Sequence, residues 1–118
     1  MLSIAAKNKV YLAVQAVDFR SGIDSLSSLC RYKFEQDPFS GHYFIFRNTR
    51  ASSIKILVYD SQGFWLCQKR LSKGAFRHWP KTAGSVVTLN NTQLQVLLQN
   101  GDPITVHTGS PWRLISDE

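Results

Sequence analysis

The sequence lacks the features that mark several specialised classes of protein. It has only two cysteines, Cys30 and Cys67, in 118 residues, and both lie in apolar contexts, so we expect free packing thiols in place of a disulfide framework. No apolar run approaches the roughly 20 residues that span a bilayer. Lysines interrupt the first 14 residues, where a signal peptide needs an unbroken apolar stretch. We therefore expect a cytoplasmic protein with no membrane partner.

Acidic residues are scarce as well. Eight Asp and Glu stand against fourteen Lys and Arg, and the formal net charge is +6. The imbalance is concentrated in residues 47–81, which contain eight basic residues and a single acid, Asp60. Ordinary solubilising surfaces mix both signs of charge, whereas a segment of one sign attracts polyanions. The charge distribution favours DNA as a partner.

What the chain does contain fits one folded domain over residues 1–118, since 43% of its residues are hydrophobic and this length buries a sizeable core. Five runs have the composition of strands, and they cover residues 9–14, 42–47, 54–59, 64–71 and 85–89. The connections between the second, third and fourth runs are short, which is typical of an antiparallel meander.

Two further segments have helical patterns. Hydrophobic residues recur at helical spacing from Ile23 to Phe34, after Ser21 and Asp24 with the spacing of a capping box, and this helix should end before Pro38. A second helix follows the N-cap candidates at 90–92 and ends near Gly101. Residues 102–118 suggest an edge strand or packing arm. The prediction is an α+β domain: a small antiparallel β-meander sheet with two helices packed on one side.

A series of short motifs runs along the chain in a fixed order: Asp18-Phe-Arg20, Gly22-Ile-Asp24, Asp37-Pro-Phe-Ser-Gly41, Phe44-Ile-Phe-Arg-Asn48, Gly63-Phe-Trp-Leu66, Lys69-Arg-Leu71 and Trp79-Pro80. In this order they resemble the TnpB-type accessory protein of the insertion sequence 66 family of bacterial transposons. In that family the short product sits beside a separate, larger transposase. The resemblance therefore implies an accessory role in transposition.

The residues offer no convergent set for catalysis. Two-metal DNA cleavage needs carboxylates gathered around the ions, yet Asp18, Asp24, Asp37 and Asp60 each fit a helix cap, a turn or an ion pair. The three histidines lack metal-ligand spacing. We expect no catalytic residues, no metal, no cofactor, no small-molecule substrate and no enzymatic activity.

The basic segment supplies the candidate nucleic-acid-binding residues, which are Arg47, Arg50, Lys55, Lys69, Arg70, Lys73 and Arg77. Phosphate contact requires cations on one exposed surface, and a solvated basic face is the alternative. Adjacent strand residues point to opposite faces, so Lys69 and Arg70 should not contribute equally. We favour Arg70, because its guanidinium can bind phosphate with two parallel hydrogen bonds.

Aromatic residues interleave with these cations. Trp65 and Trp79 are candidates for stacking on bases or for contact with a partner, whereas we assign Phe44, Phe46 and Phe64 to the core. A separate motif places Asp18 two residues before Arg20, and we predict that they form a buried or semi-buried structural ion pair.

Two functions remain in view. The first is an accessory, non-catalytic transposition protein that binds DNA, with the transposon ends as the candidate target, through the basic surface. The alternative is a protein adaptor that contacts the transposase or another transposon product through exposed aromatic residues. Salt dependence separates them, because phosphate contacts release counterions and an apolar interface does not.

Overall fold

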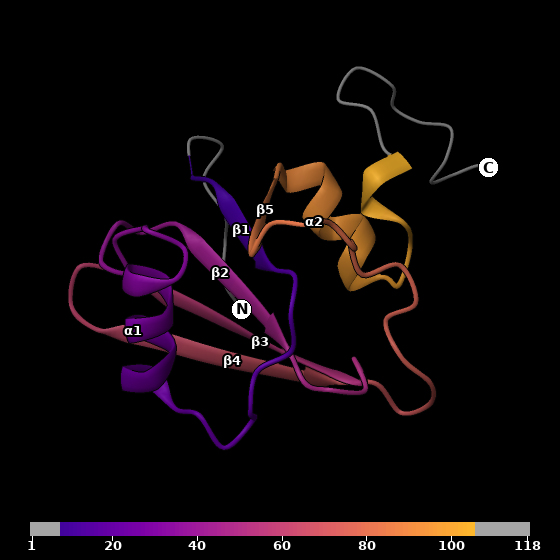
Figure 1. The fold of residues 1–118 in the computed structure, drawn as a ribbon, viewed down its shortest axis with the longest axis horizontal. Helices are drawn as coiled ribbons and strands as arrows, with labels where there is room; N and C mark the ends of the chain where they lie inside the picture. The colour runs from indigo at the N-terminus through magenta and orange to yellow at the C-terminus, as the bar shows by residue number, and fades with distance from the viewer. Residues whose placement is uncertain (1–7, 106–118) are drawn as a thin grey trace.

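The computed structural model describes residues 8–105. The elements are β1 (Val10–Ala13), α1 (Ile23–Tyr32), β2 (Tyr43–Arg47), β3 (Ser53–Tyr59), β4 (Phe64–Arg70), β5 (Val86–Leu89), α2 (Asn91–Leu98) and a short 3₁₀ helix, η1 (Pro103–Thr105). One five-stranded sheet in the order β4-β3-β2-β1-β5 carries the helices (Figure 1). The predicted α+β class is confirmed. None of the helices within these residues has the length and apolar character needed to cross a membrane.

The sheet is mixed, so the prediction of an antiparallel meander holds only for β2, β3 and β4. These strands pair antiparallel in sequence order, and a turn begun by Asp60 joins β3 to β4. Strand β1, however, pairs with β2 in parallel, with Val10 opposite Tyr43. Parallel neighbours need a crossover, and the segment that contains α1 supplies it. Strand β5 pairs antiparallel with the other side of β1.

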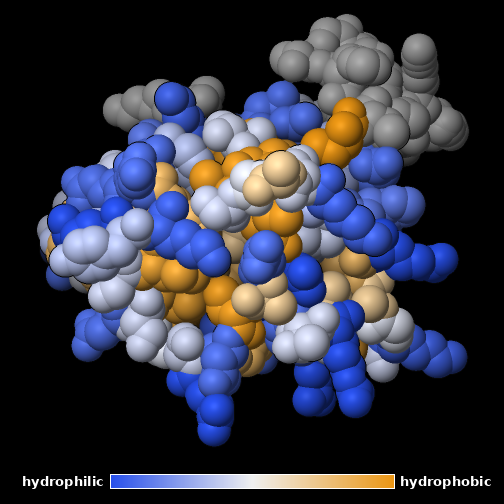
Figure 2. All heavy atoms as spheres, viewed as in Figure 1, coloured by the Kyte–Doolittle hydropathy of each residue, from blue (hydrophilic) through white to orange (hydrophobic). Residues whose placement is uncertain are grey.

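The prediction that both helices pack on one side of the sheet is wrong. Leu26 of α1 belongs to a buried cluster with Phe44, whereas Leu94 of α2 belongs to a second cluster with Ile45. Successive side chains of a strand point to opposite faces, so α1 and α2 cover opposite faces of the sheet. Strands β1 and β2 are consequently buried on both sides. Seen from the direction of Figure 1, hydrophobic atoms occupy the middle of the molecule and hydrophilic side chains project around them (Figure 2).

The helix ends follow local signals only in part. The Asn90 side chain accepts a hydrogen bond from the Gln93 amide at 2.8 Å, and the Asn90 amide donates to the Gln93 side-chain oxygen at 2.9 Å, which confirms the N-terminal cap of α2. Helix α1 ends before Pro38 as predicted, but its N-cap is Gly22 without a side-chain hydrogen bond, so the predicted capping box is wrong. The predicted arm at 102–118 lies outside the described residues except for η1 and the residues before it.

Candidate functional site

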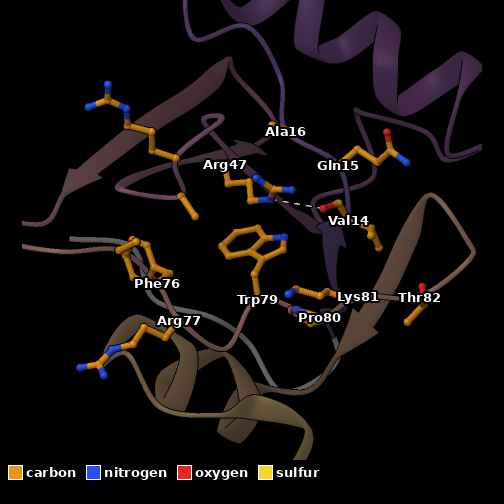
Figure 3. Close-up of a pocket in the computed structure, with 13 residues that line it drawn as sticks. Val14, Gln15, Ala16, Arg47, Phe76, Arg77, Trp79, Pro80, Lys81 and Thr82 are labelled. Carbon is orange, nitrogen blue, oxygen red and sulfur yellow. Dashed lines mark hydrogen bonds between the residues drawn. The ribbon is translucent and has the colours of Figure 1, made fainter.

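A pocket of about 490 Å³ lies at the end of the sheet where β2 leads into β3. Three chain segments line it: residues 14–16 after β1, residues 47–51 at the β2–β3 turn, and residues 75–82 between β4 and β5 (Figure 3). None of its thirteen lining residues is acidic, and four are cationic: Arg47, Arg50, Arg77 and Lys81. We call it the basic pocket.

Hydrogen bonds between the three segments fix the walls of the basic pocket. The Phe76 amide donates to the Ala51 carbonyl at 2.7 Å and ties the 75–82 segment to the β2–β3 turn. The indole N–H of Trp79 donates to the Ala13 carbonyl at 2.8 Å and ties the same segment to β1. Because these bonds join the 75–82 segment to the β2–β3 turn and to β1, the pocket is formed without a ligand.

Arg47 forms part of the pocket wall, because its guanidinium is hydrogen-bonded to backbone carbonyls. Its Nε donates to the Val14 carbonyl at 3.3 Å, drawn as the dashed line in Figure 3, and its guanidinium also donates to the Asn48 and Thr49 carbonyls. The Asn48 side chain in turn accepts hydrogen bonds from the backbone of the β2–β3 turn. The turn is therefore held in one conformation, and Arg47 brings positive charge to the pocket without being mobile.

Asn100, just beyond α2, holds the start of the 75–82 segment through the hydrogen bonds of its side chain. Its side-chain amide donates to the Ala75 carbonyl and accepts from the Arg77 amide, each at 3.0 Å. The turn that ends α2, predicted near Gly101, is formed at Asn100, which takes the left-handed conformation with φ 65°, a conformation that asparagine tolerates better than most residues. Helix α2 thereby positions the backbone that carries Arg77.

The remaining three cations of the pocket are exposed. The side chains of Arg50, Arg77 and Lys81 form no hydrogen bond or ion pair with any residue that the structure describes. Lys81 lies beside Trp79, whereas Arg77 extends outward from the pocket (Figure 3). Sequence reasoning included Lys81 in the basic segment but not among the candidate contacts. Its position in a stretch almost free of acids was the available signal.

Lys55 does not lie on this surface, and the prediction that it shares an exposed face with the other cations is wrong. Its side chain is only 9% exposed, and its ammonium donates to the carbonyls of Phe19 at 2.8 Å and Ser21 at 3.0 Å. It faces the side of the sheet that α1 covers. A lysine with its donors occupied by backbone oxygens in a covered position has little capacity for phosphate.

The other predicted contacts lie outside the pocket lining. The Lys69 ammonium donates to the Leu98 carbonyl at the C-terminal end of α2, at 2.7 Å, where the helix dipole favours a cation. Arg70 is exposed at the end of β4, opposite Ser53, and Lys73 is exposed in the following bend. The structure thus brings together Arg47, Arg50 and Arg77 of the predicted set and separates the rest.

The two tryptophans have different environments. Trp79 is 6% exposed and its N–H is already bonded, so the prediction that its ring is open for stacking is wrong. Trp65 is 52% exposed and donates to the Asp60 carboxylate at 2.7 Å. Phe44 and Phe46 are fully buried as predicted, whereas Phe64 is only partly buried.

Phe64 belongs to an aromatic group at the opposite end of β3 from the basic pocket. Its ring centre lies 5.1 Å from that of Phe39 and 5.0 Å from that of Tyr59, and Phe39 is 51% exposed. Trp65, the next residue of β4, points to the other face of the sheet, so we call Phe39, Tyr59 and Phe64 the aromatic surface. The turn beside it is held by Asp60, whose pKa is lowered by hydrogen bonds from the Gln62 amide and the Trp65 indole.

Asp18 and Arg20 form the predicted pair at 2.8 Å, but not in a buried setting. Their side chains are 55% and 91% exposed, because they lie in the loop that precedes α1. The hydrogen bonds from Arg20 lower the pKa of Asp18 to about 2. Among residues 8–105, no three His, Cys, Asp or Glu side chains are grouped so that they could hold a metal ion.

Comparison with known proteins places the chain among relatives. The family described as IS66 Orf2 like protein matches residues 8–107. The protein y4hO of Sinorhizobium fredii is 32% identical over 113 residues, which cover 96% of each chain. The protein y4jC of the same organism is 32% identical over 78 residues, 66% of this chain and 67% of that protein. No solved structure matches the chain.

Proposed function

The chain belongs to the IS66 Orf2-like family, whose members are accessory proteins associated with insertion-sequence transposition, and on that premise we propose that it binds DNA through the basic pocket and catalyses no step itself. The single observation that carries the proposal is the grouping of Arg50, Arg77 and Lys81 around a pocket lined by no acid, three exposed cations whose side chains have no partner among residues 8–105. Phosphate is the counter-charge that DNA brings to such a site.

The contrast between free and occupied cations supports this choice of surface. Lys55 and Lys69 donate to backbone carbonyls, and Arg20 is paired with Asp18. A phosphate that bound these residues would have to displace an existing partner, whereas the cations at the mouth of the basic pocket only exchange water and counterions. The proposed interface therefore comprises Arg50, Arg77 and Lys81, with Arg47 as a fixed charge in the wall.

A salt titration tests the proposal. Binding of a labelled duplex is followed by fluorescence anisotropy between 50 and 200 mM salt, conditions under which each phosphate contact contributes about 0.9 to the slope of log affinity against log salt. The triple variant Arg50→Gln, Arg77→Gln, Lys81→Gln should lower that slope by roughly 2 to 3. A double variant, Lys9→Gln before β1 with Arg31→Gln on α1, changes exposed cations that do not line the pocket and serves as the matched control. Binding without salt dependence, or a slope untouched by the triple variant, would overturn the proposal.

The aromatic surface and the exposed Trp65, at the same end of the sheet, support a second candidate, an adaptor that contacts the transposase. Phe39 and Trp65 each expose about half of their area, and exposed aromatic side chains are enriched at protein interfaces. Under this alternative, Phe39→Ser and Trp65→Ser abolish capture of purified transposase while duplex binding is unchanged. The two candidate surfaces lie at opposite ends of β3, so each variant set leaves the other surface intact.

A further inference from the structure

The shape of the basic pocket points to a narrower ligand than duplex DNA. We infer that it receives an unpaired nucleotide of a single DNA strand, with the base inside and the phosphates at the rim; this inference rests on the proposed DNA binding. A site that only neutralises a duplex needs cations on an open surface, because duplex phosphates lie along exposed ridges. Here the cations surround a recess.

The walls of the recess are apolar where the rim is charged. Ala51, Ala75, Trp79 and Pro80 contribute to the lining between the basic residues. A bare anion gains nothing from such walls, whereas a nucleotide has an apolar, flat base attached to a charged phosphate. A base within a duplex is stacked and paired, so only an unpaired one can enter.

The volume and the polar groups of the pocket also suit a nucleotide. About 490 Å³ lies within the roughly 300–1,000 Å³ of pockets that enclose small molecules. Gln15 and Thr82 add an amide and a hydroxyl to the lining, and within the described part of the chain neither side chain has a hydrogen-bond partner. The edge of an unpaired base offers the donors and acceptors that these groups can bond.

The framework is rigid enough to discriminate between ligands. The bonds from Trp79 to Ala13 and from Phe76 to Ala51 hold two walls of the pocket at fixed positions. A preformed recess binds a matching group without the cost of ordering loops. Selectivity for the unpaired strand should therefore depend on the space inside the pocket, and not on its charge alone.

The test compares three labelled DNA hairpins of the same stem: one blunt, one with a short single-stranded overhang, and one whose overhang is abasic. The abasic overhang has the same phosphates without bases. We expect the normal overhang to bind roughly fivefold or more tightly than the blunt stem, because its base buries apolar surface against the pocket lining. The abasic overhang keeps only the contribution of its added phosphates. It should therefore lose most of the gain in affinity that the normal overhang has over the blunt stem.

Variants that fill the pocket complete the experiment. Ala16→Leu and Ala75→Leu narrow the lining without changing any charge, and Ala83→Leu adds the same side chain at an exposed position outside it. Thermal melting identifies the variants that fold. Each folded pocket variant should lose the preference for the overhang and keep the affinity for the blunt stem. The Ala83→Leu control should keep both.

The outcomes distinguish the binding of an unpaired nucleotide from DNA binding in general. Equal binding of blunt and overhang DNA, an abasic overhang as good as the normal one, or a preference that survives both pocket variants would overturn the nucleotide inference and leave the proposed DNA binding intact. If no form of DNA binds with salt dependence, the proposed function itself fails.

Discussion

The ammonium of Lys55 lies 2.8 Å from the carbonyl oxygen of Phe19 and 4.8 Å from the centre of its ring. A residue in the middle of β3 thus holds the loop that leads into α1. Because α1 is part of the crossover between β1 and β2, this contact helps to fix the parallel pairing that distinguishes the sheet from a simple meander.

We expect Lys55→Met to destabilise the protein by about 1–3 kcal/mol, because two carbonyls in a covered position lose their donor. Urea denaturation measures the change in the free energy of unfolding. Lys33→Met, at an exposed position beside α1, should change it by no more than about 0.5 kcal/mol. A Lys55→Met protein with normal stability and weakened DNA binding would return Lys55 to the list of contacts.

The Asp18–Arg20 pair should make a small contribution to the stability of the fold, and this contribution should be present only within a defined pH range. The pKa of Asp18 in the folded protein is about 2, below its ordinary value of 3.8. A lowered pKa stabilises the fold above the ordinary pKa, and this contribution is lost as the pH falls through the folded value. Both side chains are exposed, so the contribution is weak.

Asp18→Asn should therefore lower the melting temperature slightly at pH 7, and the difference from the unmodified protein should disappear as the pH falls from 4 towards 2. Melting curves across this range test the expectation. A large loss of stability at pH 7 would mean that Asp18 supports the loop before α1 through more than the exposed pair.

Local signals in the sequence predicted the parts of the fold that are determined locally. Asp60 and Gly63 indicated the β3–β4 turn, and the Asp60 side chain indeed accepts from the turn amides. The N-cap candidates at 90–92 predicted the start of α2, where the Asn90 side chain accepts from the Gln93 amide. In each case the residues that interact are close in sequence, so the pattern contains the whole interaction.

The relative placement of the helices depends on distant contacts, and the prediction failed there. A usable signal was nonetheless present in the sequence: all four residues of β1 are hydrophobic, and a strand without polar alternation is typical of one covered on both faces. Likewise, nothing near Lys55 in the sequence marks it as the donor to Phe19, 36 residues away. Three segments that are separate in the sequence line the basic pocket. The charge composition therefore predicted that a site would be positively charged, but not which residues would line it.

The support of the basic pocket by Asn100 can be separated from the backbone conformation that this residue adopts. Asn100→Gly keeps the left-handed conformation available but removes the bonds to Ala75 and Arg77. We expect a loss of about 1–2 kcal/mol in the free energy of unfolding and weaker duplex binding, because the backbone at Arg77 is no longer fixed. Gln99→Ala, at the exposed neighbouring position, should alter neither. Unchanged binding by a measurably destabilised Asn100→Gly protein would show that the pocket does not need this anchor.

The proposal of a non-catalytic role predicts that the purified protein with magnesium or manganese neither cleaves nor joins DNA. The Asp18 carboxylate is bonded to Arg20 and the Asp60 carboxylate to its turn and to Trp65, so each already serves a structural purpose. Gel assays on supercoiled plasmid and on labelled duplex measure the activity. Metal-dependent cleavage that is lost in Asp18→Asn or Asp60→Asn would assign these residues a catalytic role and reject the proposal.

The last prediction separates Lys69 from Arg70, which are neighbours on β4. The Lys69 ammonium is bonded to Leu98 at the end of α2, whereas Arg70 is exposed at the same end of the sheet as the β2–β3 turn of the basic pocket. DNA held at the pocket can extend to Arg70 without breaking a protein contact. Arg70→Ala should weaken binding of all sequences alike and lower the salt slope by about 1, with little change in stability.

Lys69→Ala is the matched comparison, and it should leave the salt slope unchanged while lowering the melting temperature, because α2 loses a donor at its C-terminal end. The reverse result, a reduced slope for Lys69→Ala and none for Arg70→Ala, would place the DNA on the α2 side of β4. In that case the Lys69–Leu98 bond would have to break when DNA binds. The melting temperature of the DNA complex would then be the same with and without the Lys69→Ala change, and this measurement would identify the broken bond.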